Sequence, residues 1–90
     1  KFDVLFGLGC TYRSLGEYDN ALIYFEKTLV EYPNSEAVMP FYAMCLYNLG
    51  RSKEAIELLL GILVDTTNSD EIKAYKKAIL YYATDLDKVC

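Results

Sequence analysis

The side chains best suited to covalent chemistry in this 90-residue chain are three cysteines, Cys10, Cys45 and Cys90. A cysteine acts as a nucleophile when a neighbouring base raises its thiolate fraction, and histidine, the usual base, is absent from the sequence. An odd number of cysteines without histidine matches neither a disulfide framework nor a zinc site. Free thiols indicate a reducing compartment, so we expect a cytoplasmic protein.

The acidic residues and glycines offer no better catalytic pattern. Glu26 and Glu54 are typical of carboxylates scattered along helix exteriors, whereas acid–base catalysis of glycosidase type needs two that converge. The pair Gly7-x-Gly9 lacks the third glycine and the preceding strand of a phosphate-binding loop, so we interpret it as helix packing. The sequence therefore predicts no enzymatic activity, no cofactor and no metal.

The composition is that of one small globular domain over residues 1–90. The chain is 53% hydrophobic and 24% charged, which does not fit a disordered protein. Its apolar run at residues 58–64, which includes Gly61, is far shorter than the roughly 20 residues of a membrane span. A net charge of −4 disfavours phosphate backbones. We therefore expect no nucleic acid and no membrane as partner. Because an apolar segment follows Lys1 at once, we also expect a fragment of a longer chain or a processed end.

A repeat of 34 residues organises the chain. Residues 2–35 laid over residues 36–69 give eight identities. A fixed period of this length indicates stacked supersecondary units, each unable to bury its apolar face alone. The identical pairs are Val4/Val38, Leu15/Leu49, Gly16/Gly50, Ala21/Ala55, Leu29/Leu63, Val30/Val64, Asn34/Asn68 and Ser35/Ser69.

Apolar periodicity and turn residues predict five helices, at about 2–15, 18–32, 36–49, 52–64 and 70–87. Gly16 and Gly50 should end the first and third helices in the left-handed conformation. We expect N-caps from Asn34-Ser35 and from Asn68-Ser69. A kink or an irregular first turn is expected at Pro40.

Small residues should sit where antiparallel helices meet. We expect Gly9 to face Ala21 and Ala43 to face Ala55, and we attribute Gly61 to a close helix approach. Three larger side chains, Tyr12, Phe25 and Leu59, are predicted to lie in the core. The last helix should bury a stripe made of Ile72, Tyr75, Ile79, Tyr82 and Leu86, with Lys88 on its outer side.

The first unit carries Leu5-x-x-Leu8-Gly9-x-x-Tyr12, then Ala21-x-x-x-Phe25, then Pro33. This pattern and the repeat length resemble the tetratricopeptide repeat. The second unit fits less well, with Thr67 where proline is usual. The resemblance implies an all-α fold: two helix-turn-helix repeats, at about 2–35 and 36–69, followed by a C-terminal capping helix at about 70–87, stacked as a right-handed superhelix.

The resemblance also implies a concave groove that receives a peptide or a helix. Members of the family that clamp a C-terminal carboxylate carry basic residues at groove positions that here are Phe6, Cys10, Phe41, Glu71 and Tyr75, so an acidic tail is not expected. Phe6 and Met44 could equally be packing residues. The groove residues that the resemblance implies are Phe6, Cys10, Arg13, Met44, Tyr47, Asn48 and Tyr81.

The predicted function is that of a protein–protein interaction scaffold that binds a peptide or helix in an apolar groove. The alternative is a structural repeat segment without an independent ligand, whose helices stack on missing repeats or, through the N-terminal helix that begins with Phe2 and Phe6, on another copy of the chain. A third hypothesis is a redox-responsive thiol protein that uses Cys10 and Cys45.

Overall fold

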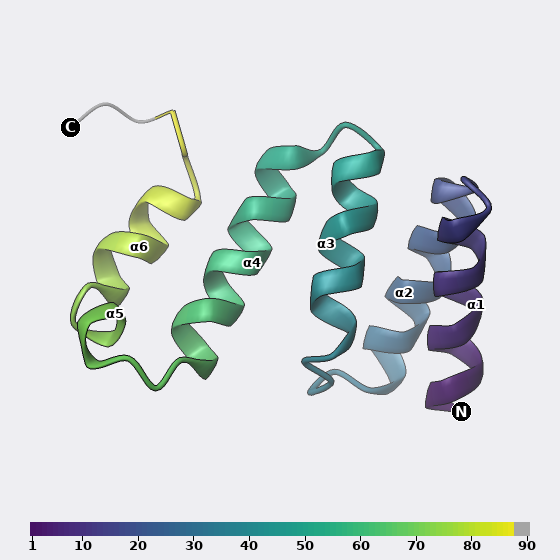
Figure 1. Cartoon of the computed structure of the whole chain (residues 1–90), viewed down its shortest axis with the longest axis horizontal. Helices are drawn as coiled ribbons and strands as arrows, with labels where there is room; N and C mark the ends of the chain where they lie inside the picture. The colour runs from purple at the N-terminus through teal and green to yellow at the C-terminus, as the bar shows by residue number, and fades with distance from the viewer. Residues whose placement is uncertain (88–90) are drawn as a thin grey trace.

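The computed structural model describes residues 1–87, and every regular element in that range is a helix, as the sequence predicts. The predicted outer position of Lys88 and the third cysteine, Cys90, lie outside the described residues. The helices follow one another along the longest axis of a molecule measuring 40 × 26 × 18 Å (Figure 1). They are α1 (Phe2–Ser14), α2 (Tyr18–Glu31), α3 (Val38–Asn48), α4 (Ser52–Thr66), α5 (Asp70–Ala74) and α6 (Lys76–Ala83).

Two glycine turns build the two helix pairs. Gly16 and Gly50 have φ angles of 77° and 79°, the left-handed conformation predicted for them. The same backbone bond closes both turns: Glu17 N donates to Tyr12 O at 2.9 Å, and Arg51 N donates to Leu46 O at 2.8 Å. The chain thus folds back twice, and α1 packs on α2 as α3 packs on α4 (Figure 1).

The core of the first pair is closed by the third helix. Ala21, Phe25, Val38 and Cys45 are fully buried together, two from α2 and two from α3. The bare backbone of Gly9 lies against Phe25, so close that a Cβ atom there would be 2.6 Å from Phe25 Cε1. We expected Gly9 to face Ala21, and the side-chain atoms nearest to a Cβ atom at Gly9 belong to Phe25, one helical turn further along α2.

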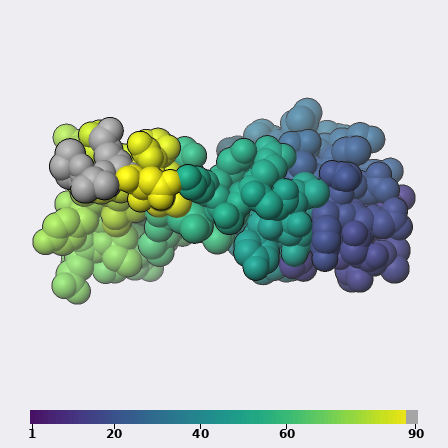
Figure 2. Space-filling model, turned by 90° about the horizontal axis from the view of Figure 1, so that it is seen from above, coloured from purple at the N-terminus to yellow at the C-terminus, as the bar shows by residue number. Residues whose placement is uncertain are grey.

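The second pair has a smaller core. Ala43 and Ala55 are buried in one cluster with Leu46, as the small-residue pairing predicts. Beyond this pair, α6 packs on the far side of α4, and α5 packs on α6. Figure 2 shows the molecule narrowing at the residues of α4, between the α1–α3 body and the C-terminal helices. The link between the two ends of the molecule therefore depends on one helix.

The third helix begins later than predicted. Its N-cap is Ala37, which makes no side-chain cap bond, so Asn34-Ser35 does not cap it. Pro40 is the third residue of α3, where a backbone N–H has no partner within the helix, and proline is tolerated there. The irregular turn precedes the helix instead, with Met39 N bonded to Glu36 O at 3.2 Å. The second predicted cap is confirmed: Ser69 accepts a hydrogen bond from Ile72 N at 3.3 Å.

The prediction of one continuous last helix with a buried stripe is wrong. The helix breaks at Tyr75, whose φ of −102° and ψ of 13° separate α5 from α6. Tyr75 is 67% exposed, and Tyr82 and Leu86 also face solvent. Since α6 packs on α4 and contacts α3 at most weakly, most of its surface stays in water, and only Ala83 is buried within residues 70–87.

Gly61 was expected to allow a close helix approach, and that expectation is wrong. A Cβ atom at this position of α4 would meet nothing within 4 Å outside the helix itself. The glycine therefore weakens the helix without a packing reason that the structure shows.

Alanine substitutions at the two helix-interior glycines, Gly61 and Gly9, should change the free energy of unfolding in opposite directions. Gly61→Ala should raise the free energy of unfolding by about 0.5–1 kcal/mol, because it adds helix propensity in open space. Gly9→Ala should lower it by about 1–3 kcal/mol, because the new methyl group overlaps the ring of Phe25. Urea denaturation of the two variants measures both changes. Equal effects of the two substitutions would contradict the packing at Gly9.

Candidate partner-binding site

Four of the seven groove residues expected from the sequence lie around one open hollow of about 410 Å³. They come from two helices: Arg13 from α1, and Met44, Tyr47 and Asn48 from α3. The wall contributed by α4 was not expected as part of a site. The α4 wall consists of Ser52, Ala55, Ile56 and Leu59, and Ala43 of α3 lies at the base of the hollow.

Arg13 and Asn48 hold the edge of the hollow between the first and second repeats. The guanidinium Nε of Arg13 donates to Asn48 Oδ1 at 2.9 Å, across a separation of 35 residues. Among residues 1–87 no carboxylate forms an ion pair with Arg13. The edge is therefore fixed by a neutral acceptor, and the positive charge stays open to a partner.

The floor and the far wall of the hollow are apolar and exposed to solvent. Tyr47 is 67% exposed, and Met44, Ile56 and Leu59 are each exposed by more than 40%. Leu63, one turn beyond Leu59 on α4, is also 40% exposed. Apolar side chains gathered on one face in this way mark a site for another protein surface more often than single exposed leucines do.

The other three expected residues lie elsewhere. Phe6 is half-buried among aromatic rings, with centroids 5.3 Å from Phe41 and 6.1 Å from Phe25. Cys10 is half-buried against the core of the first pair. Tyr81 is on α6, where it forms an edge-to-face pair with Tyr82 at 5.2 Å. The structure thus places these three outside the hollow.

Leu59 corrects the predicted core. The 34-residue register pairs it with Phe25, which is fully buried, yet Leu59 is 42% exposed. Phe25 is covered because α3 packs across α1 and α2, whereas α6 does not take the same place over α3 and α4. The register identified the position, but its burial requires a helix packed over α3 and α4, which residues 1–87 do not supply.

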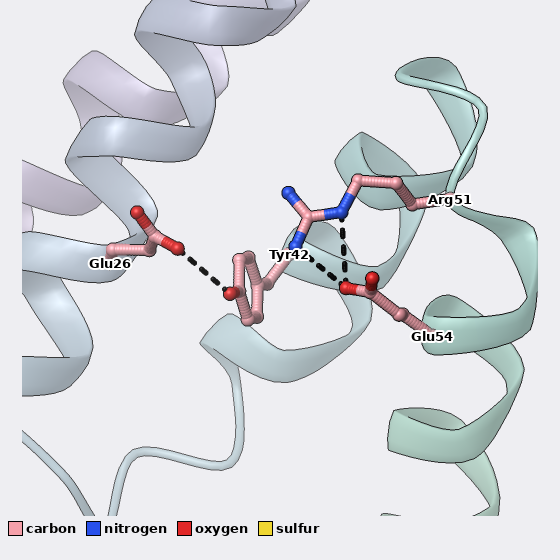
Figure 3. Close-up of polar contacts among 4 residues, drawn as sticks. All are labelled: Glu26, Tyr42, Arg51 and Glu54. Atoms are coloured by element: carbon pink, nitrogen blue, oxygen red, sulfur yellow. Dashed lines mark hydrogen bonds and ion pairs between the residues drawn. The ribbon is translucent and has the colours of Figure 1, made fainter. Parts of the chain in front are cut away.

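A second hollow of about 470 Å³ lies on another side of α3 and α4, and two of the carboxylates that line it, Glu54 and Asp65, form ion pairs. Arg51 holds Glu54 through Nε at 3.0 Å and Nη2 at 2.6 Å, while Tyr42 donates its hydroxyl to Glu26 Oε2 at 3.1 Å (Figure 3). Burial first, and then the Glu26 carboxylate, raises the pKa of Tyr42, so its hydroxyl stays protonated and donates. The Tyr42–Glu26 hydrogen bond joins α3 to α2, and the Arg51–Glu54 pair joins the N-cap of α4 to its first turn.

The two described cysteines are poor nucleophiles in this fold. Burial raises the pKa of both Cys10 and Cys45, and the lowering influence of Arg13 is the smaller one. Cys45 also donates its thiol to Tyr18 O at 3.2 Å. Neither thiol is placed for the redox-response hypothesis. Within residues 1–87 no group of three or more cysteine or acidic side chains could hold a metal ion.

In a Cys90→Ser variant, Cys45 should stay unreactive toward an aromatic disulfide reagent at about pH 8, because its raised pKa keeps the thiol protonated and its side chain is buried. Release of the coloured thiolate measures the reaction, and concentrated urea should make both remaining thiols react as the matched control. Two fast-reacting thiols in the native variant would contradict the described burial.

Comparison with known proteins agrees with this architecture. A family model described as "Tetratrico peptide repeat" matches residues 3–86, nearly the whole chain. No curated protein matched the sequence. No helix in the described part of the chain is long and apolar enough to cross a membrane. Stacked helix pairs with glycine turns, a repeat of 34 residues and this match together show that the chain belongs to the tetratricopeptide repeat family.

Proposed function

We propose that this chain is a protein-interaction module that binds an amphipathic helix or peptide on the apolar face formed by α3 and α4. Repeats of this family generally serve protein–protein interaction and are not typically catalytic. The observation that carries the proposal is the exposure of Leu59, at 42%, in a position whose counterpart Phe25 is fully buried by a docked helix.

The shape of the face favours a helical ligand. Ile56, Leu59 and Leu63 lie at steps of three and four residues along α4, so they share one stripe. Met44 and Tyr47 of α3 lie across the same hollow. A partner helix with apolar residues at matching steps would place them between the two rows, which is how an amphipathic helix binds a groove.

The polar edge adds orientation. Asn48 Oδ1 already accepts a hydrogen bond from Nε of Arg13, so the Arg13 side chain is positioned before a partner arrives. Free thiols at Cys10 and Cys45 fit a reducing compartment, and we propose the cytoplasm as the place of action.

Leu59→Glu should weaken binding of peptides selected on this chain from a random peptide library by about tenfold or more, since it puts a charge in the centre of the apolar face. Val30→Glu is the matched control, because Val30 is 80% exposed on α2, away from the hollow, and should change the affinity by less than about twofold. Fluorescence anisotropy gives the affinities, and circular dichroism verifies the folding of each variant. Unchanged peptide affinity of folded Leu59→Glu would overturn the proposal.

A further inference from the structure

We propose that a second copy of this chain is a partner for the α3–α4 face, and that it docks with its own α1. The inference rests on the proposed function, since it names an occupant of the same face. It would give a head-to-tail association of repeats, in which α1 of one molecule takes the place over α3 and α4 that α3 itself takes over α1 and α2.

The internal interface provides the template. In each molecule α3 packs on the α1–α2 pair through Val38 and Cys45, which are both fully buried. Leu49, which follows α3, packs on the same core. The receiving side is formed by Leu22, Phe25 and Leu29 of α2. Every residue of this interface has a counterpart 34 positions away, and the counterparts lie on two different helices, α1 and α4.

The first surface is on α1. Val4 is the counterpart of Val38 and is 57% exposed, where Val38 is fully buried. Leu15, the counterpart of Leu49, is 66% exposed, and Leu8, the counterpart of Tyr42, also faces water. These three positions, which we call the entering surface, correspond to residues at the end of the first pair that are buried or half-buried, and two of the three are identical to their counterparts.

The second surface is on α4. Ile56, Leu59 and Leu63 are the counterparts of Leu22, Phe25 and Leu29, and each is at least 40% exposed. We call them the receiving surface. Leu63 repeats Leu29, and Ala55 at the base of the hollow repeats the fully buried Ala21. The chain thus exposes both halves of an interface that it builds once internally.

The specific contacts of the internal interface also translate into compatible pairs. Each hydrogen bond that joins α3 to α1 or α2 maps, by a shift of 34 residues, onto two groups that suit each other. The hydrogen bond between Arg13 and Asn48 corresponds to a pair formed by Tyr47 and Ser14 of the second copy. The hydrogen bond from Cys45 to Tyr18 O corresponds to Thr11 of the second copy and Ser52 O. The hydrogen bond between Tyr42 and Glu26 corresponds to Leu8 of the second copy and Leu60. Two polar pairs stay polar, and one becomes wholly apolar.

The C-terminal helices leave the receiving surface open. Val64 is 4% exposed although its identical counterpart Val30 is 80% exposed, and α6 packs on α4, so α6 covers a side of α4 whose equivalent on α2 is uncovered. Ion pairs of Asp65 with Lys76 and of Lys53 with Asp87 hold the segment on that side. The stripe that α3 uses on α2 is therefore still exposed on α4.

The contact between copies should be weaker than the internal one. Phe41 packs on Phe6 inside the molecule, with ring centroids 5.3 Å apart, and the shifted pair is Gly7 on Pro40. The contact is also heterologous, because it joins two different surfaces, so it can extend through further copies rather than stop at a dimer.

Sedimentation velocity from about 10 µM to about 1 mM tests the inference. The unaltered chain should show an average mass that rises with concentration and passes that of a dimer. Val4→Asp removes the entering surface and Leu59→Asp removes the receiving surface, so each variant alone should stay monomeric. Their equimolar mixture should form a dimer and nothing larger, because each variant retains the surface that the other lacks. Val30→Asp, a change at an exposed valine outside both surfaces, should behave as the unaltered chain.

Three outcomes would overturn the inference: an unaltered chain that stays monomeric throughout, a mixture of the two variants that stays monomeric, or association that only Val4→Asp abolishes. The last result would indicate a symmetric contact between two α1 helices.

Binding of the selected peptides separates this failure from that of the proposed function. If Val4→Asp binds them normally and Leu59→Asp does not, the α3–α4 face binds partners and only the second copy is excluded. If neither peptides nor copies depend on Leu59, both proposals fall.

Discussion

The packing of the Phe25 ring on the bare backbone of Gly9 is the contact on which the rest of the molecule depends. It brings α1 and α2 close enough for α3 to lie across both, and the fully buried Val38 and Cys45 complete that cluster. Protein cores tolerate little unfilled or overlapping volume, so this arrangement admits one spacing of the three helices. The spacing in turn places Arg13 within hydrogen-bonding distance of Asn48 and sets the edge of the partner-binding face.

Local signals predicted most of the fold. The turns at Gly16 and Gly50 follow from glycine's access to the left-handed conformation, and the helix spans between them follow from apolar spacing. The break at Tyr75 could not be predicted in this way, because the segment contains neither glycine nor proline and its apolar pattern is continuous. Whether such a pattern forms one helix depends on what it packs against, and α6 packs mainly on α4.

The candidate site was predictable to the extent that it repeats. The shared register indicated that Met44, Tyr47 and Asn48 lie on the same side of α3, and the structure brings them to one hollow with Arg13. The register also implied that Leu59 is core, since Phe25 is, and there it misled. Burial is a property of the neighbours of a residue, and a repeat at the end of a described array lacks the neighbour that its predecessor has.

The narrowing of the molecule at α4 has a consequence for motion. In a repeat array, stability is roughly the sum of each unit and its interfaces, so segments held by one interface open more readily than those held by two. α2 is enclosed by α1 and α3, whereas α6 packs mainly on α4 and α5 packs on α6. Backbone amides of α6 should therefore exchange with solvent deuterium through frequent local opening. Those around Phe25 should exchange only when the whole chain unfolds. The C-terminal helices can then detach and return without disturbing the first repeat.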